Sequence, residues 1–387
     1  MTTLPQERVR SHRWEGKGVE LRTVVDELRR LHAELAYEET GDRDHPHPRN
    51  CVMNLVISVS DERRAEAVAK VVKGVSAGHP LRAIVLYRLE DAQGDGLDAE
   101  ITTEAHELVR GASVQREQVT LRVRGSTGTH VASLVEPLLV SDVPTYLWWT
   151  GTPPLAERGL RDTLTVADVL IVDSAHFDTP VASFMDLAAL ADRLGDRISF
   201  VDLQWARQRA WREILAQFFS PEERREFLVG MRRLTVEGVG SGQRSRIGAA
   251  LLVGWLAGAL GLRFRVGVSV SEASADALLE GPQGQMVQAT FRSTTAEGLD
   301  EGVLLAVQFD GKTQDKRFAM RVEINRERPD HAHAHVDIGG VETLSQRLPL
   351  PQPTEAELLL HALSTARRDR VYVRSLEAAA ALVDALR

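Results

Sequence analysis

The sequence predicts a two-domain protein that combines helices and sheets. Its N-terminal part contains short, wholly apolar runs separated by a helical segment, which is typical of buried parallel strands joined by crossovers. Its C-terminal part contains runs in which apolar and polar residues alternate, which is typical of an antiparallel sheet with one solvated face. We therefore expect an α/β N-terminal domain with a mixed, largely parallel sheet, and an α+β C-terminal domain with a mainly antiparallel sheet and helices.

The segment 141–212 carries the clearest signal for the first domain. Residues 143–149, 169–174 and 200–202 form apolar runs, each bounded by a polar or turn-forming residue. Apolar side chains in residues 180–194 recur at helical spacing. A strand, a helix and a strand in this order predict a βαβ unit, whose two strands are parallel. Four of the six Trp residues lie in this segment, which suits either a core or an interface.

The rest of the N-terminal part predicts a leading helix and the remaining strands of the sheet. Residues 1–17 are polar and expected to be loosely structured, and residues 40–50, with prolines at 46 and 48, form an extended linker. Asp61 is expected to cap the helix after the first strand. The expected helices are 19–35, 61–75 and 128–139, and the expected strands are 51–60, 81–89, 99–103 and 118–124.

The C-terminal part follows two short helices near residue 220. A helix at 211–219 precedes a second one, for which Ser220 is the expected N-cap and Pro221 the first helical residue. We expect domain limits of 1–50 for the N-terminal helix and linker, 51–226 for the α/β domain and 227–387 for the α+β domain. The expected strands are 231–237, 263–270, 286–293, 303–309, 316–324 and 332–338, and the expected helices are 247–262, 354–367 and 374–386.

Composition is typical of a soluble globular chain and argues against several classes of protein. The 387 residues include 43% hydrophobic and 26% charged side chains, with a formal net charge of −8. The negative charge argues against nucleic acid as a partner. The single cysteine, Cys51, excludes an internal disulfide and fits a cytoplasmic location. The N-terminus has no apolar signal core, and segment 247–262 is too short to span a bilayer, so no membrane association is expected.

A glycine-rich turn is the first candidate for a ligand site. Gly238, Gly240 and Gly242 are followed by Arg244 and Arg246 at the start of a predicted helix, an arrangement that suits an anion. The glycine spacing does not match a dinucleotide fingerprint, and no acidic residue ends the next strand. The favoured interpretation is a close-packed turn, with Arg244 and Arg246 as candidate anion contacts.

Alternating histidines are a candidate metal site. His331, His333 and His335 would share one face of a strand, a spacing that can serve a metal ion. Only Asp330 and Asp337 stand nearby as further ligands, so a solvated strand is the favoured interpretation. No metal and no cofactor are therefore expected.

Residues 173–178 contain the side-chain types of a hydrolase triad. Asp173, Ser174, His176 and Asp178 are close in sequence, whereas the members of a triad come from separate elements. Asp173 is therefore interpreted as a strand-end residue or helix cap. No catalytic residue is assigned and no enzyme activity is expected.

Several segments of the chain resemble a known family. They are Asn-Leu-Val-Ile at 54–57, His-Pro-Leu-Arg-Ala-Ile-Val at 79–85, Val-Pro-Thr-Tyr-Leu-Trp-Trp at 143–149, Val-Asp-Ser-Ala-His-Phe at 172–177, Asp-Leu-Gln-Trp-Ala-Arg at 202–207 and Trp-Arg-Glu at 211–213. Together they resemble the OpcA family, the glucose-6-phosphate dehydrogenase assembly proteins of actinobacteria and cyanobacteria. Cyanobacterial relatives are linked to thioredoxin through C-terminal cysteines, which this chain lacks, so the actinobacterial type is the closer match.

The resemblance implies a function, and the residues alone leave a second one open. The resemblance implies a non-catalytic partner that binds glucose-6-phosphate dehydrogenase and activates it allosterically, supporting NADPH production in the oxidative pentose phosphate pathway. The alternative is a small-molecule or sugar-phosphate binding sensor or enzyme that uses the strand-end acids Asp173 and Asp202 together with Arg244 and Arg246. The poor catalytic inventory favours the first hypothesis.

Aromatic and basic residues of the central segment are candidates for the contact with the dehydrogenase. Trp and Arg are the side chains most enriched at binding hot spots, although core filling is favoured for Trp148 and Trp211. We expect Arg207 and Arg209 to be exposed, so that alanine at either position leaves the fold intact. The candidate contact residues are Trp148, Trp149, Trp205, Arg207, Arg209 and Arg212.

Overall fold

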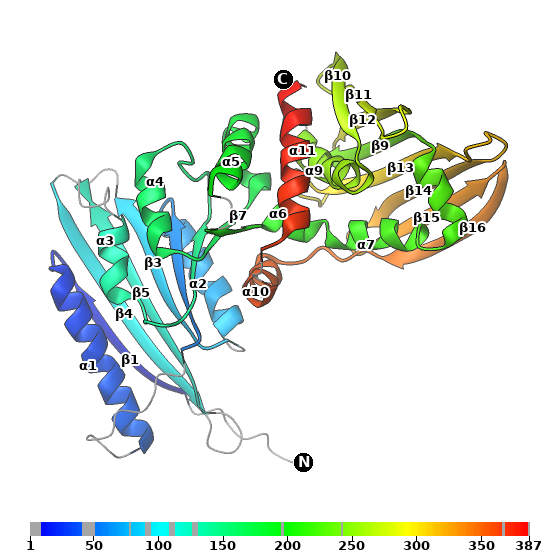
Figure 1. Ribbon diagram of the computed structural model, residues 1–387. Helices are drawn as coiled ribbons and strands as arrows, with labels where there is room; N and C mark the ends of the chain where they lie inside the picture. The colour runs from blue at the N-terminus through cyan, green and yellow to red at the C-terminus, as the bar shows by residue number, and fades with distance from the viewer. Residues whose placement is uncertain are drawn as a thin grey trace, which may run out of the picture. The chain divides into compact units, whose positions relative to one another are not determined.

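A computed structural model of the chain describes residues 9–40, 51–76, 79–89, 94–107, 113–125, 131–194, 197–240, 243–365 and 368–385. The expected linker after residue 40 lies outside the described residues. The chain divides into two compact units and contains two eight-stranded sheets (Figure 1). The first unit comprises Met1–Val172, Asp196–Ser199 and Glu355–Ala366, and the second comprises Asp173–Gly195, Phe200–Thr354 and Arg367–Arg387.

The first sheet is mixed and largely parallel, as the sequence predicts. Its strand order is β1-β4-β5-β3-β2-β6-β7-β8. The pairs β1–β4 and β4–β5 are antiparallel, and the pairs from β5 through β3, β2 and β6 to β7 are parallel. The strands are β1 (Val9–Gly16), β2 (Met53–Val59), β3 (Leu81–Leu89), β4 (Gly96–Glu107), β5 (Ser113–Arg124), β6 (Thr145–Trp149), β7 (Val169–Val172) and β8 (Ser199–Asp202).

Burial of both faces explains why the central strands are mostly apolar. All four residues of β7 are buried, and β2 has only one residue that is not. Helix α1 packs on β4 and β1, whereas α2 packs on β3 and β2 and is itself contacted by α10. Asp61 caps α2 as expected, because its Oδ1 accepts a hydrogen bond from the Arg64 amide at 2.8 Å. The helices of this unit are α1 (Leu21–Thr40), α2 (Glu62–Ser76), α3 (Val131–Val135), α4 (Arg158–Thr163) and α10 (Glu355–Thr365).

The N-terminal segment contains a strand that the sequence analysis did not predict. Residues 9–16 form β1, which pairs with β4 in a register that places Trp14 opposite Ile101. The expectation of a loosely structured N-terminus is therefore wrong for these residues. Successive residues of β1 alternate between exposed and half-buried, and the strand lies at the sheet edge, so no wholly apolar run marked it.

The second sheet is antiparallel except for one pair. Its order is β10-β11-β12-β9-β13-β14-β15-β16, and only β12 and β9 are parallel. This confirms the predicted mainly antiparallel sheet. The strands are β9 (Met231–Val239), β10 (Arg263–Val270), β11 (Ser274–Glu280), β12 (Met286–Thr294), β13 (Leu304–Lys312), β14 (Ala319–Arg328), β15 (His331–Ile338) and β16 (Val341–Pro349).

Helices cover one face of the second sheet. Several of them precede its first strand, β9, in the sequence. The apolar helix α9 packs on β9 and β12, with α11 and α5 against it, so most of its apolar side chains are buried. The expected Ser220 cap is wrong: Pro221 occupies the N-cap position of α8, and no side chain caps that helix. The helices are α5 (Pro180–Leu194), α6 (Leu203–Arg207), α7 (Arg209–Phe218), α8 (Glu222–Val229), α9 (Gln243–Leu260) and α11 (Arg370–Ala385).

The two units follow a different division from the expected domain limits. Residues 173–226, expected in the first domain, lie mostly in the second unit, and α10 belongs to the first. The expected domain limits of 1–50, 51–226 and 227–387 stay a prediction. Among the described residues, the structure contains no helix with the length and apolarity needed to cross a bilayer.

Candidate functional site

Two aspartates at strand ends form the centre of a polar cluster in the second unit. Asp173 follows β7 and caps the short 3-10 helix Ser174–His176, where its side chain accepts a hydrogen bond from the Ala175 amide. Asp202 ends β8 and caps α6 by accepting from the Gln204 amide at 2.9 Å. The interpretation of Asp173 as a strand-end residue and cap is confirmed.

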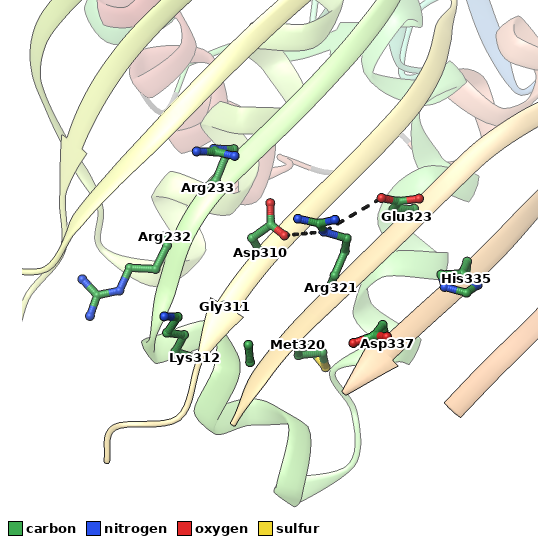
Figure 2. Close-up of a pocket in the computed structure, with 11 residues that line it drawn as sticks. Arg232, Arg233, Asp310, Gly311, Lys312, Met320, Arg321, Glu323, His335 and Asp337 are labelled. Atoms are coloured by element: carbon green, nitrogen blue, oxygen red, sulfur yellow. Dashed lines mark hydrogen bonds and ion pairs between the residues drawn. The ribbon is translucent and has the colours of Figure 1, made fainter. Parts of the chain in front are cut away.

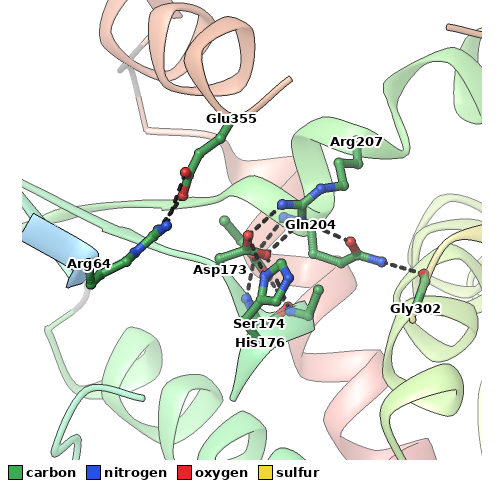
Figure 3. Close-up of polar contacts among 10 residues, drawn as sticks. Arg64, Asp173, Ser174, His176, Gln204, Arg207, Gly302 and Glu355 are labelled. Atoms are coloured by element: carbon green, nitrogen blue, oxygen red, sulfur yellow. Dashed lines mark hydrogen bonds and ion pairs between the residues drawn. The ribbon is translucent and has the colours of Figure 1, made fainter. Parts of the chain in front are cut away.

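Asp173 is held ionised by two cationic or polar neighbours (Figure 3). Its carboxylate oxygens accept from the two terminal nitrogens of Arg207 at 2.7 and 2.5 Å, and from His176 Nδ1 at 2.9 Å. Burial by itself would raise the pKa of Asp173, but the hydrogen bonds and charges of Arg207 and His176 outweigh it and hold this pKa well below its usual range. The geometry is that of a bidentate Arg–carboxylate pair.

Asp202 is fully buried, and in the described part of the chain its hydrogen-bond partners are all uncharged groups. Its oxygens accept from the Ser174 amide at 3.0 Å, the Ser174 hydroxyl at 2.6 Å, the Gln204 amide at 2.9 Å and the Tyr372 hydroxyl at 3.3 Å. Burial, followed by the negative charge of Asp173, raises the pKa of Asp202 to about 6, despite these hydrogen bonds. The two neighbouring carboxyl groups therefore have pKa values shifted in opposite directions.

The cluster does not have the arrangement of a hydrolase. The Ser174 hydroxyl bonds to Asp202, whereas the His176 imidazole bonds to Asp173, so hydroxyl and imidazole are engaged by different carboxylates. A serine nucleophile needs its histidine as the direct hydrogen-bond partner. The contacts instead link the strand ends to α6 and α11, which is a structural role.

Trp205 and Arg212 extend the cluster through a stacked pair. The Arg212 guanidinium lies 3.4 Å from the Trp205 ring centroid and also donates to the Trp205 carbonyl at 2.7 Å. The Trp205 indole nitrogen donates to Asp369 at 3.0 Å. Burial lowers the pKa of Arg212 to about 10. Trp205 is thus buried and Arg212 half-buried, and both are held by contacts within this unit.

The two arginines that were expected to be exposed differ sharply. The Arg207 side chain is only 19% exposed and is bonded to the buried Asp173, so the expectation that Arg207 is exposed is wrong. The effect of alanine at this position on the fold stays a prediction. Arg209 is 57% exposed and pairs with Glu213 on the next turn of α7 at 2.7 Å. Arg209 therefore has the exposure that a partner contact requires.

Trp148 and Trp149 belong to the first unit and occupy different environments. Trp148 is wholly buried, with the Arg64 guanidinium 5.9 Å from its ring centroid, whereas Trp149 is half-buried. Arg64 also pairs with Glu355 of α10 (Figure 3). Of this pair, Trp149 is the less buried residue.

The candidate anion contacts both have protein partners. Arg244 lies 3.7 Å from Glu301, and Arg246 donates to the carbonyl of Ser271. Gly240 has a φ of 115°, which favours glycine, and residues 241–242 lie outside the described part of the chain. These contacts fit the close-packed turn better than an open anion site.

The three histidines lie on β15 and alternate with buried Ala332 and Ala334. His331 pairs with Asp330 at 2.9 Å, His333 with the Ser345 hydroxyl at 3.0 Å and His335 with Glu342 at 3.2 Å. Among the described residues, no group of three or more His, Cys, Asp or Glu is arranged to hold a metal ion.

Sequence reasoning missed the members of the cluster that come from α11. Asp369 caps this helix by accepting from the amides of Val371 and Tyr372, both at 2.9 Å, and Tyr372 reaches Asp202. An Asp directly before a helix is a recognisable cap signal. Nothing in the sequence, however, indicates that this cap lies beside Trp205, which stands 164 positions earlier.

Comparison with known proteins defines the class of the chain. Residues 72–189 match the model of the glucose-6-phosphate dehydrogenase subunit N-terminal domain, and residues 198–376 match that of its C-terminal domain. The chain is thus a protein with both domains of this subunit class. It belongs to the OpcA family of glucose-6-phosphate dehydrogenase assembly proteins.

The chain is also similar to individual relatives and to solved structures. Proteins called "Putative OxPP cycle protein OpcA" are 28% identical over 188 residues in Synechocystis sp. and 31% over 145 residues in Synechococcus elongatus. These alignments cover 48% and 38% of this chain but only 38% and 31% of the relatives. The 3-ketoreductase KijD10 of Actinomadura kijaniata, solved with NADP and TDP-benzene, is 16% identical, with a TM-score of 0.47 and coverage of 87% of this chain and 97% of that one.

Proposed function

We propose that this chain is a non-catalytic assembly factor and allosteric activator of glucose-6-phosphate dehydrogenase. The observation that carries the proposal is the match of both subunit domains along residues 72–189 and 198–376. In this role the chain acts in the cytoplasm, needs no cofactor of its own and supports NADPH production in the oxidative pentose phosphate pathway. An activator of this kind must bind the active state of the enzyme more tightly than the inactive state.

The polar cluster supports a binding role over the alternative of a small-molecule enzyme. That alternative would use Asp173 and Asp202 at the strand ends and Arg244 and Arg246 at the glycine-rich turn. Asp173 is bonded to Arg207, Asp202 accepts several hydrogen bonds, and both turn arginines have protein partners. A catalytic acid or base needs access to substrate, which these contacts oppose.

A coupled assay tests the proposed activation. Purified dehydrogenase is assayed across glucose 6-phosphate concentrations, with and without excess chain, and the chain is also assayed alone. We expect a lower half-saturating substrate concentration in its presence and no NADP reduction by the chain alone. An unchanged saturation curve at excess chain would reject the proposed activation.

We further propose that Trp149 and Arg209 contact the dehydrogenase. Both expose part of their side chain, whereas Trp148, Trp205, Arg207 and Arg212 are held by contacts inside their units and would act by shaping the surface.

Replacing Arg209 with Ala should weaken binding of the dehydrogenase by about 1–3 kcal/mol, the loss typical of a hot-spot residue. Arg22→Ala on α1, where the side chain is 89% exposed, is the matched control and should bind as the wild type does. Titration of the dehydrogenase with each variant measures its affinity, and circular dichroism verifies that each variant is folded. Wild-type affinity of the Arg209 variant would remove α7 from the interface.

A further inference from the structure

The face of the second sheet opposite α9 carries a cavity of about 650 Å³ (Figure 2). Strands β9, β13, β14 and β15 form its floor. A volume of this size is in the range that small-molecule ligands occupy in proteins. Cationic, acidic and imidazole side chains surround it, and the ones that carry the argument are Arg232, Arg233, Lys312, Glu323, His335 and Asp337.

A β-bulge places two adjacent arginines in this cavity. The pairing of β9 with β13 sets Arg233 opposite Asp310 and Met231 opposite Gly311, so Arg232 is left without a partner residue across the ladder. In a regular strand, neighbouring side chains point to opposite faces. Here Arg232 and Arg233 are both exposed between the buried Met231 and Leu234, and both line the cavity. Bulges often redirect side chains at functional sites.

Two glycines make this corner possible. A Cβ atom on Gly230 would lie 1.7 Å from the carbonyl oxygen of Lys312, and one on Gly311 would lie 2.5 Å from that of Phe227. The close approach holds Lys312 next to the bulge, because the Lys312 amide donates to the Gly230 carbonyl at 3.0 Å. The corner therefore fixes three cations, Arg232, Arg233 and Lys312, at one end of the cavity.

Arg232, Arg233 and Lys312 differ from Arg321, the fourth cation in the cavity, in their hydrogen-bond partners. Arg321 is engaged, since its Nε donates to Asp310 at 2.7 Å. Within the described residues, the side chains of Arg232, Arg233 and Lys312 make no hydrogen bond or ion pair. Three positively charged side chains that line the same cavity in a chain with a net charge of −8 favour a bound anion, and a planar guanidinium group matches the oxygens of a phosphate.

The opposite end of the cavity offers hydrogen-bond acceptors. Glu323, His335 and Asp337 come from β14 and β15, on the far side of Arg321 from the bulge (Figure 2). Carboxylates repel a phosphate but accept hydrogen bonds from hydroxyl groups. A ligand that fits both ends thus carries negative charge at one end and hydroxyl groups at the other.

We propose that this cavity binds a phosphorylated sugar. The phosphate lies against Arg232, Arg233 and Lys312, and the sugar hydroxyls donate to Glu323 and Asp337. This binding is a property of the chain alone and does not depend on the proposed activation of the dehydrogenase.

Isothermal titration of the purified full chain with glucose 6-phosphate, glucose and inorganic phosphate tests the proposal. We expect saturable binding of glucose 6-phosphate that is tighter than that of the other two probes. The double variant R232Q/R233Q should weaken it at least about tenfold, because it removes two charge-assisted contacts to the phosphate. The control R292Q/R347Q removes two exposed arginines that do not line the cavity, and it should bind as the wild type does.

Three outcomes would overturn the proposal. They are the absence of saturable binding, equal affinity for inorganic phosphate, and an equal loss of affinity in both double variants. If glucose 6-phosphate fails to bind but R232Q/R233Q weakens binding of the dehydrogenase, the bulge is a protein contact and the sugar-phosphate site is rejected. Activation measured in the coupled assay is a separate readout, so either proposal can fail without the other.

Discussion

At the scale of single residues, Arg207 and Arg209 form a matched pair with opposite surroundings. Arg207 neutralises Asp173, which is 7% exposed, whereas Arg209 pairs with Glu213 at the surface of α7. Removing one partner of a buried ion pair leaves an uncompensated charge and typically costs about 3–5 kcal/mol. We expect Arg207→Ala to cost about 3 kcal/mol of unfolding free energy, and Arg209→Ala less than about 1 kcal/mol.

Urea denaturation of the wild type and both variants measures these costs. Because Arg207 and Arg209 are the same residue type at neighbouring positions, loss of a positive charge is common to both variants. Equal stability losses would show that the Asp173 ion pair contributes nothing beyond a surface charge.

Asp202 makes the stability of the protein depend on pH in the mildly acidic range. Its folded-state pKa of about 6 lies above the ordinary value of 3.8, so the folded state keeps this proton when the unfolded state has released it. The resulting stability is complete below about pH 4 and is lost as pH rises through 6. At 1.36 kcal/mol per pKa unit, the shift corresponds to about 3 kcal/mol.

Asp173 affects the pH dependence of stability in the opposite direction. Its lowered pKa gives stability that is lost as pH falls below about 4.

Asp202→Asn isolates this contribution, since asparagine does not titrate. We expect the stability of the wild type relative to the Asn variant to decrease between pH 4 and pH 6.5, measured by urea unfolding at each pH. A difference that is constant across this range would mean that Asp202 keeps an ordinary pKa.

At the scale of elements, the sequence predicts the limits of a helix or strand best where its whole pattern of apolar residues lies within one segment. Helix Pro180–Leu194 and strand Leu81–Leu89 have the predicted limits, because each carries its complete apolar pattern. Strand β11 was missed because Ala, Leu and Glu are good helix formers, and only its packing in the sheet imposes alternating burial. Strand β16 was missed because it is an edge strand with no buried residue in positions 341–349.

The polar cluster was only partly predictable for the same reason. The positions of Asp173 and Asp202 at strand ends follow from the local sequence. The contact of Asp202 with Tyr372 joins residues 170 positions apart, and the ion pair of Asp173 with Arg207 joins residues 34 apart. A single sequence contains no signal for such contacts, so Arg207 was expected at the surface.

The glycine corner of β9 and β13 gives a prediction at this scale. Alanine at Gly230 would place a Cβ atom 1.7 Å from a backbone oxygen, which cannot move without breaking the sheet corner. We expect Gly230→Ala to cost more than about 2 kcal/mol, in the range of strained or overpacked sites. Gly151→Ala is the control, because no heavy atom lies within 4 Å of its added Cβ. Thermal unfolding of both variants provides the measurement, and equal melting temperatures would contradict the strained corner.

At the scale of the whole molecule, the family membership and the two sheets both favour a protein that binds its partners on exposed surfaces. The strand ends, where α/β proteins commonly hold ligands, are filled here by the contacts of Asp173 and Asp202. The open face of the second sheet instead carries the bulge with its arginines. We therefore expect ligands and partners of this chain to bind on exposed surfaces.

The response to oxidation is also a property of the whole chain, because it depends on how many cysteines the chain contains. Cys51 is the only cysteine, and its thiol donates to the carbonyl oxygen of Met53 at 3.1 Å. Burial raises the pKa of this thiol, which keeps it in the less reactive protonated form. A chain with one cysteine cannot form an internal disulfide. We predict that Cys51→Ala activates the dehydrogenase as the wild type does, both under oxidant and under reductant, in the coupled assay. If a redox response of the complex is present with the wild type and disappears with Cys51→Ala, Cys51 is a redox switch and this prediction is wrong.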